Sequence, residues 1–322
     1  MRATTLVTGA AGFAGGHLLD LLVGERAGDE NVIVGWHRPG GKSAPRQGVE
    51  WQSVDILDRH AVRAAIDRLR PAVVYHCAGA AHVGHAWDKT EATFAINVRG
   101  THNLLDALER MSRVARAGSG DETTVVIPSS ALVYAPADHA SRETDPIAPD
   151  GPYGVSKLAQ EMLASHAGAG LKVIVARAFN HFGPRQDPFF AASGWARRLA
   201  DIERGRWPEA TIAVGNLEAR RDLTDVRDTV RAYRLMAAQG RHGDVFNVCS
   251  GTAIPIRELL DRLIARARVA VTVTVDPARM RPSDTPVLLG DPARIQAALG
   301  WRAEIPLDRT LDDLLDYWRT RD

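Results

Sequence analysis

Two side chains that together favour proton transfer, Tyr153 and Lys157, lie four residues apart in a segment with a helical pattern. Residues at this spacing share one face of a helix, so we expect the phenol and the ammonium to be neighbours. A free phenol has a pKa of about 10, which a nearby cation would lower toward neutral pH. Only four of the 40 basic residues are lysine, which singles out Lys157. Tyrosine and lysine also occur at this spacing by chance, so the pattern needs support from other residues.

A pair of serines gives that support. Ser129 and Ser130 follow a predicted strand over residues 124–127, and ligands of open α/β sheets bind beyond the carboxyl ends of the strands. A polar turn after a strand would use serine equally well. Taken with Tyr153 and Lys157, Ser130 predicts a site for proton relay and hydride transfer. Tyr153 would exchange the proton, Ser130 would orient and polarise the substrate oxygen, and Lys157 would support both Tyr153 and a nicotinamide ribose.

A glycine-rich segment near the N-terminus is typical of dinucleotide binding. Gly9, Gly12 and Gly15 have the spacing G-x-x-G-x-x-G between a short apolar strand and a helix predicted to begin at Phe13. The first glycine would permit a tight turn, the second a close approach to the pyrophosphate, and the third close packing of helix on strand. The N-terminal N–H groups of the helix, starting at Phe13, would favour the anion. The alternative is a glycine-rich turn that binds nothing.

The residues after the second and third predicted strands bear on which dinucleotide binds. An NAD-preferring site usually carries an acid after the second strand, whereas this chain has Arg38 there. Arg38 would meet a 2′-phosphate, so we favour NADP(H), keep NAD(H) possible, and note that a solvated surface arginine is the alternative. Asp55, after the third strand, is placed to accept from an adenine amino group. Asp58 suits the competing role of helix cap better than Asp55 does.

Short apolar runs alternate with longer helical patterns, one of them over Ala92–Arg113, which predicts an α/β fold built on a Rossmann doubly wound parallel sheet. From residue 180 the alternation loosens, so we expect a smaller, interleaved C-terminal substrate-binding domain. The expected NADP-binding Rossmann domain spans residues 1–179 and also receives about 223–250; the nucleotide-sugar-binding domain spans 180–222 and 251–322. The predicted sheet strands are Thr5–Thr8, Val32–Trp36, Val49–Val54, Val73–His76, Thr124–Ile127, Val173–Ala176 and Val245–Val248.

Composition excludes several classes of protein. The chain has 322 residues and a formal net charge of +1, which argues against nucleic-acid binding by bulk charge and against a polybasic membrane patch. No apolar run is long enough for a signal-peptide core or a membrane span, so we expect a cytoplasmic protein. Cys77 and Cys249 cannot form a disulfide framework, and no metal-ligand spacing is present, so we predict no metal. His76 is predicted to be a packed core residue, and His82 to line a sugar pocket.

With these residues in place, the chain resembles the extended short-chain dehydrogenase/reductase family, also called the NAD-dependent epimerase/dehydratase family, over essentially its whole length. It is most similar to the group of GDP-4-keto-6-deoxy-D-mannose reductases. The resemblance implies that Ile56 and Ala78 also contact the cofactor. The shared motifs are T-G-A-A-G-F-A-G from Thr8, D-I from Asp55, H-C-A-G from His76, N-V-R-G-T from Asn97, Ser130, Y-G-V-S-K from Tyr153, F-N-H-F-G-P from Phe179, G-N-L-E-A-R-R-D from Gly215 and R-P-S-D from Arg281.

The same resemblance implies a GDP-sugar substrate and its ligands. Asn180 would meet the diphosphate, Arg221 and Arg281 phosphate or nucleoside, and Asp284 a ribose hydroxyl. The chemistry agrees, since guanidinium groups suit phosphates and a carboxylate suits a diol. The alternative is a set of surface ion pairs, Arg221 with Asp222 and Asp225 with Arg227. The family also implies a homodimer formed through a helix bundle.

One departure from the related 4,6-dehydratases narrows the expected reaction. Those enzymes have an acidic residue just after the serine, whereas this chain has Ala131 and Leu132, which cannot move a proton. We therefore expect NADPH-dependent reduction of GDP-4-keto-6-deoxy-D-mannose to GDP-D-rhamnose, a step of polysaccharide biosynthesis. The alternatives are a nucleotide-sugar 4-epimerase, a reductase of a GDP-4-keto-6-deoxy-heptose, and a catalytically silent NADP-binding sensor.

Overall fold

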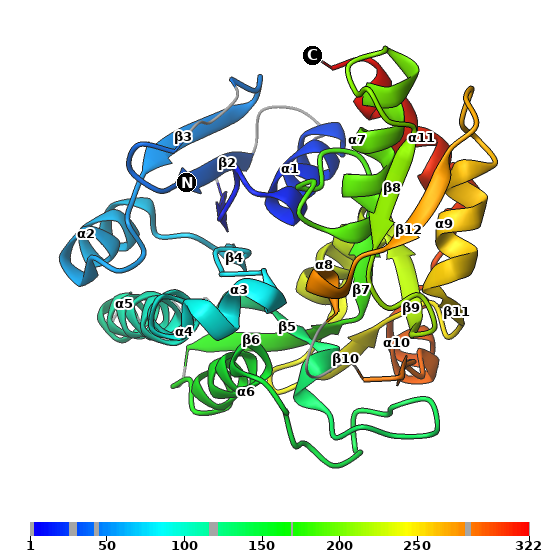
Figure 1. Ribbon diagram of the computed structural model, residues 1–322. Coiled ribbons are helices and arrows are strands. Elements are labelled where there is room, and N and C mark those ends of the chain that lie inside the picture. Colours follow the sequence, from blue (N-terminus) through cyan, green and yellow to red (C-terminus); the bar gives the residue numbers. More distant parts are fainter. Residues whose placement is uncertain are drawn as a thin grey trace.

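Seven parallel strands form the central sheet of the computed structural model, in the order β10-β6-β5-β4-β1-β2-β3 (Figure 1). The structure describes residues 3–25, 31–41, 45–115, 122–168, 170–280 and 285–321. The strand order reverses between β1 and β4, which opens a crevice at the carboxyl ends of these strands. The Rossmann prediction is therefore confirmed. The strands are β1 (Ala3–Thr8), β2 (Asn31–His37), β3 (Val49–Ser53), β4 (Val73–His76), β5 (Thr123–Ser130), β6 (Leu171–Ala178) and β10 (Val245–Val248).

Helices cover both faces of this sheet. Successive strand residues face opposite sides, so Leu6 joins the core under one layer of helices and Val7 joins the core under the other. One layer contains α2 (Arg59–Leu69), α5 (Thr101–Ala115) and α6 (Pro152–Ser165), with α3 (Val83–Asp88) and α4 (Thr90–Phe94) beside α6. The other layer contains α1 (Phe13–Gly24), α8 (Val226–Gln239) and α10 (Ala293–Leu299).

A second group of elements has an apolar core of its own and lies to the right in Figure 1. Trp195, Leu260 and Leu314 belong to this core, and all are buried. Its strands are β7 (Asn180–Phe182), β8 (Thr211–Val214), β9 (Arg220–Asp225), β11 (Ala253–Pro255), β12 (Thr272–Val275) and β13 (Val287–Leu288). Its helices are α7 (Ala191–Glu203), α9 (Ile256–Ile264) and α11 (Leu307–Arg319). Within the described part of the chain, no helix is both long and apolar enough to cross a membrane.

The segment before α5 departs from the single long helix that the sequence pattern predicts over Ala92–Arg113. A π-helical turn at Ala95–Gly100 separates α4 from α5. Within this turn Asn97 is fully buried, and its side chain accepts a hydrogen bond from the Ala80 amide at 2.8 Å and donates one to the Ser156 hydroxyl at 2.9 Å. The wider turn thus joins the loop after β4 to helix α6.

Candidate active site

The predicted catalytic residues come together where β5 meets α6. Ser130 is the last residue of β5, Tyr153 lies in the first turn of α6, and Lys157 follows one turn later. The Ser130 hydroxyl faces the Tyr153 phenol, and it accepts a hydrogen bond from the Leu132 amide at 3.1 Å. A Cβ at Gly154 would lie 2.3 Å from the Leu132 carbonyl oxygen, so this glycine lets α6 lie directly against the end of β5.

The electrostatics of the site differ from one expectation of the sequence. Burial raises the pKa of Tyr153 to about 12, and the hydrogen bond from Ser130 only partly opposes this. The predicted lowering by Lys157 is therefore wrong. The Lys157 ammonium donates to the Pro128 carbonyl at 2.6 Å and to Gln160 Oε1 at 2.5 Å. Burial lowers the pKa of Lys157 to about 8, while the Glu161 carboxylate acts in the opposite direction.

The glycine-rich loop has the geometry that a pyrophosphate requires. Gly9 has a φ of +62°, and a Cβ there would lie 2.6 Å from the Ala78 nitrogen. A Cβ at Gly15 would lie 2.3 Å from the Gly9 carbonyl oxygen, which explains why the helix packs so closely on the loop. Gly12 is the N-cap of α1 and supplies no side-chain cap, and the first turn from Phe13 has no acidic residue. The N-terminal N–H groups are thus in a setting that favours an anion, and these residues fit a dinucleotide.

The other predicted cofactor residues line the same edge of the sheet. Arg38 is exposed just after β2, and Asp55 is exposed after β3, where its carboxylate accepts from the Leu57 amide at 2.9 Å. Asp58 is the N-cap of α2, as predicted, which leaves Asp55 outside the capping role. Ile56 lies against Gly100, and the Ala78 amide donates to the Thr8 hydroxyl at 3.1 Å.

Two of the predicted substrate residues lie on the facing group of elements. Asn180 begins β7 and is exposed, and Arg221 lies on β9. The Arg221 guanidinium donates to the Thr285 carbonyl at 2.8 Å, which ties β9 to the segment that begins at Thr285. Arg281 and Asp284 lie outside the described residues. His82 stacks on Phe190 with 4.8 Å between ring centroids.

The neighbouring acidic residues show which charges are structural. The Asp222 carboxylate accepts from the Ser250 and Gly251 amides at 2.7 and 2.9 Å, and burial raises its pKa. Asp222 therefore serves the backbone and does not pair with Arg221 as the surface alternative supposed. Asp225 does pair with Arg227, at 2.6 Å.

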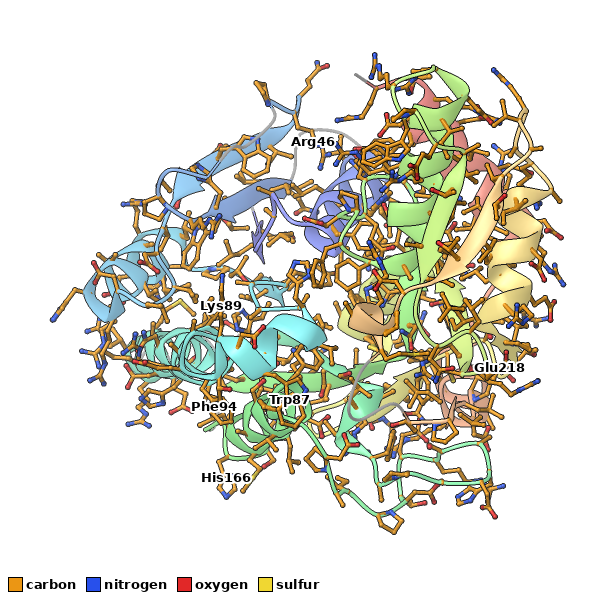
Figure 2. The ribbon with its side chains drawn as sticks, in the orientation of Figure 1. Arg46, Trp87, Lys89, Phe94, His166 and Glu218 are labelled. Atoms are coloured by element: carbon orange, nitrogen blue, oxygen red, sulfur yellow. The ribbon has the colours of Figure 1, made fainter. Side chains whose placement is uncertain are left out.

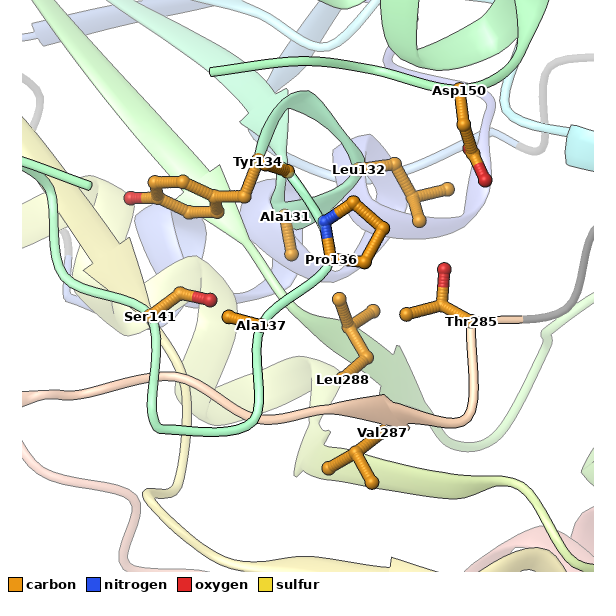
Figure 3. A pocket seen from close by; sticks show the side chains of 11 residues that line it. Ala131, Leu132, Tyr134, Pro136, Ala137, Ser141, Asp150, Thr285, Val287 and Leu288 are labelled. Carbon is orange, nitrogen blue, oxygen red and sulfur yellow. The ribbon is translucent and has the colours of Figure 1, made fainter. Parts of the chain in front are cut away.

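Three cavities are lined by described residues other than the predicted catalytic ones. One of about 10 Å³ lies at the turn that follows β5, and Figure 3 shows Leu132, Thr285 and Leu288 around it. It shares several lining residues with an open, mainly apolar cavity of about 580 Å³ between residues 135–146 and 285–287. A third, of about 280 Å³, lies between α7 and β8. There the Arg198 guanidinium carbon lies 3.4 Å from the centroid of the Trp207 ring, which gives a charged and aromatic wall.

The sequence did not predict the polar contacts that the buried side chains behind the catalytic residues make. His76 is buried, as predicted, and its pKa is lowered to about 3, first by burial and then by the charge of Lys157. Gln160 and Glu161, which follow Lys157 on α6, are buried as well. The only signal in the sequence is their position three and four residues after Lys157, on or near its helix face.

Comparisons with known proteins agree with this geometry. Residues 6–314 match the family described as GDP-mannose 4,6 dehydratase. The chain is 34% identical over 328 residues to the GDP-6-deoxy-D-mannose reductase of Pseudomonas aeruginosa, covering 100% of this chain and 99% of that protein. A solved Pseudomonas aeruginosa structure, RMD complexed with NADPH, covers 99% of this chain and 100% of its own, with a TM-score of 0.83 and 33% identity. The Thermus thermophilus UDP-glucose 4-epimerase in complex with NAD covers 98% of this chain and 99% of its own, with a TM-score of 0.84 and 28% identity.

Proposed function

The chain belongs to the GDP-mannose 4,6 dehydratase family, and from that premise we propose that it is an NADPH-dependent reductase of the C4 ketone of GDP-4-keto-6-deoxy-D-mannose, giving GDP-D-rhamnose. One observation carries the proposal. The Ser130 hydroxyl faces the Tyr153 phenol, yet the residues that follow Ser130 are Ala131 and Leu132. A dehydratase must move further protons beside the serine, and these two side chains move none. Their carbon atoms suit a sugar whose C6 has already lost its hydroxyl.

The proton chemistry follows from the site. NADPH, when bound, supplies the hydride that C4 of the sugar receives. Reduction needs a proton donor at the C4 oxygen, and the pKa of about 12 keeps the Tyr153 phenol protonated at neutral pH. Ser130 donates a hydrogen bond to the same oxygen and stabilises the negative charge that develops there. Lys157 stabilises the phenolate that Tyr153 becomes and binds the nicotinamide ribose.

The cofactor would lie along the carboxyl edge of the sheet. Gly9, Gly12, Phe13 and Gly15 would hold the pyrophosphate on the N-terminus of α1. Arg38 would pair with the 2′-phosphate that distinguishes NADPH from NADH. Asp55 would accept from the adenine amino group, with Ile56 and Ala78 on either side of the dinucleotide. The NADPH bound to the Pseudomonas aeruginosa relative supports this choice over NAD.

The nucleotide of the substrate would lie on the facing elements. Arg221 and Asn180 would hold the diphosphate, with Arg281 and Asp284 completing the nucleoside site from the chain before Thr285. The cavity of about 280 Å³ between α7 and β8 supports a base at this end of the site, because Trp207 and Arg198 offer stacking surfaces. His82 would contact the sugar from the opposite wall.

We also propose that the protein is a homodimer through α5 and α6. On the outer face of α6, Val155 and Met162 are 40% and 57% exposed, and on α3 Trp87 is 54% exposed. Figure 2 shows Trp87, Phe94 and His166 along this side of the molecule. A helix-bundle interface would bury the apolar side chains of Trp87, Val155 and Met162. Met162→Asp should convert a dimer to a monomer in light scattering, and a wild-type monomer would overturn the proposal.

The test of function measures the oxidation of NADPH by its absorbance, with GDP-4-keto-6-deoxy-D-mannose generated in situ by a dehydratase. Tyr153→Phe should slow turnover by about 10²–10⁴-fold, the usual contribution of a general acid. Tyr317→Phe removes the same hydroxyl from α11, away from the site, and should leave turnover unchanged. Full activity in Tyr153→Phe would refute the proton donor.

The same assay decides between substrates and reactions. Failure of wild-type protein to consume NADPH would refute this substrate, and the corresponding heptose would be tried next. Purified protein that carries bound NAD and interconverts C4 epimers without net oxidation would instead be a 4-epimerase, the activity named for the Thermus thermophilus neighbour.

A further inference from the structure

The Lys157 ammonium is held by one acceptor on β5 and one on its own helix. Two of its three donors are used, one by the Pro128 carbonyl at 2.6 Å and one by Gln160 Oε1 at 2.5 Å. Among the described residues it has no third hydrogen-bond partner, which leaves one donor for a ribose hydroxyl or for Tyr153. Gln160 is therefore the side chain that fixes where the ammonium lies, and its own orientation becomes important.

The orientation of Gln160 is determined by its neighbours. An ammonium can only donate, so the oxygen of the Gln160 amide must face Lys157 and the nitrogen must face away. That nitrogen donates to the Thr101 hydroxyl at 2.8 Å, and the same hydroxyl gives its proton to the Asn97 carbonyl at 2.6 Å. Gln160, Thr101 and Asn97 are all fully buried, so no water competes for these bonds.

The chain of hydrogen bonds continues to the loop that holds the cofactor. Because the proton of Thr101 is already used, His76 Nε2, 2.9 Å away, must be the donor to Thr101. His76 Nδ1 then accepts from the Thr8 hydroxyl at 2.8 Å, and the Thr8 hydroxyl accepts from the Ala78 amide at 3.1 Å. Thr8 directly precedes Gly9 of the glycine-rich loop. Each hydrogen bond from Ala78 to Lys157 thus has an assigned direction.

Few charges face Lys157. Glu161 lies one turn later on α6 and Tyr153 one turn earlier, while His76 and Cys77 lie at the end of β4. His76 stays neutral because its pKa is about 3, and burial raises the pKa of Cys77 to about 12, so neither carries charge at neutral pH. The Glu161 carboxylate is occupied by Arg177 at 2.8 Å. Gln160 is then the only side chain among the described residues that accepts a hydrogen bond from the ammonium.

We propose that Gln160, oriented by Thr101 and His76, is a positioning residue that holds the Lys157 ammonium protonated and in place for the cofactor ribose and Tyr153. The inference rests on the proposed role of Lys157. It assigns a function to a residue that touches neither substrate nor cofactor, and it links the position of that ammonium to the loop after β1.

The test follows the affinity for NADPH, by fluorescence titration, from about pH 7 to about pH 10. This measurement needs no sugar substrate, so it is independent of whether the proposed reaction is correct. Gln160→Leu removes the acceptor. The midpoint of the loss of NADPH affinity should then lie about one pH unit lower than in wild type, so that at the wild-type midpoint the variant binds NADPH about tenfold more weakly. Gln160→Glu places a carboxylate there and should move the loss to a higher pH. Shifts of the pH profile in opposite directions for the two variants are what a positioning role predicts.

A second pair of variants keeps the test decisive if the variants at residue 160 fail to fold. Thr101→Val removes the hydroxyl that orients Gln160 and should shift the profile in the same direction as Gln160→Leu. Thr101→Ser keeps the hydroxyl and should restore the wild-type profile. Profiles that keep the wild-type midpoint, or that shift in the same direction for Leu and Glu, would overturn the inference, and equal losses of affinity at every pH would show a merely structural role.

Discussion

Replacing Arg177 with methionine should destabilise the protein by more than most single substitutions do. The Arg177 and Glu161 side chains are only 5% and 9% exposed, and their charged groups are 2.8 Å apart. Arg177 Nε also lies 3.1 and 3.2 Å from the two carboxylate oxygens, and the Ser129 hydroxyl donates to the same carboxylate at 2.5 Å. Removing the cation leaves a buried carboxylate with one serine as its remaining side-chain partner. The expected loss of unfolding free energy is about 3–5 kcal/mol.

Urea denaturation of Arg177→Met and of a matched control measures this loss. Arg257 and Glu218 are also an ion pair, at 2.9 Å, but their side chains are 55% and 79% exposed. Water screens such a pair, so Arg257→Met should cost only about 0–1 kcal/mol. Figure 2 shows Glu218 at the surface. The two variants make the same chemical change at nearly the same distance, and burial is what separates them.

A double-mutant cycle completes the argument. Glu161→Met alone leaves a buried guanidinium, and the double variant Arg177→Met with Glu161→Met leaves neither charge. The double variant should be more stable than the sum of the two single losses predicts, by about 2–3 kcal/mol. Additive losses, or a loss under about 1 kcal/mol in Arg177→Met, would refute the view that desolvation governs this pair.

Three further outcomes are expected. Gly15→Ala should abolish NADPH binding in a fluorescence titration, because its Cβ would lie 2.3 Å from the Gly9 carbonyl oxygen; unchanged affinity would contradict the proposed loop. Arg38→Ser should weaken NADPH binding about tenfold or more and leave NADH binding within about twofold, since only NADPH has the 2′-phosphate. The pKa values of His17 and His76 are lowered to about 4 and about 3, so below about pH 6.5 the unfolded chain binds more protons than the folded one. Stability, measured by urea unfolding, should therefore be complete above about pH 6.5 and fall by up to about 1.4 kcal/mol per pH unit for each histidine below it; a flat profile would contradict this.

The sequence predicted those parts of the site that depend on local geometry. The loop around Gly9, Gly12 and Gly15 is short, and its conformation follows from the strand before it and the helix after it. Tyr153 and Lys157 share a helix face because four residues complete about one turn. Asp58 caps α2 as predicted, because a cap is a contact between residues two and three apart.

The parts that the sequence did not predict depend on residues far apart in the chain. His76 lies 68 residues from Thr8 and 25 from Thr101, and no spacing rule relates them. The π-helical turn at Ala95–Gly100 breaks a helical pattern that sequence periodicity reads as continuous. The direction of the pKa shift of Tyr153 was also missed, because burial is a property of the assembled site and the Lys157 ammonium donates to Pro128 and Gln160 instead.

The site also explains why lysine stands at residue 157 in a chain that otherwise favours arginine. An ammonium carries three donors on one atom, so it can reach the Pro128 carbonyl, Gln160 Oε1 and a ribose hydroxyl from a single buried point. A guanidinium spreads its donors over three nitrogen atoms in a rigid plane, so they do not act from one point. Its charge is also permanent, whereas burial lowers the pKa of Lys157 to about 8, close enough to neutral pH for its neighbours to control its charge. Lysine suits this position because its charge is compact and meets acceptors on its own helix and on β5. Gln160 is one of these acceptors, so the choice of lysine depends on it as well.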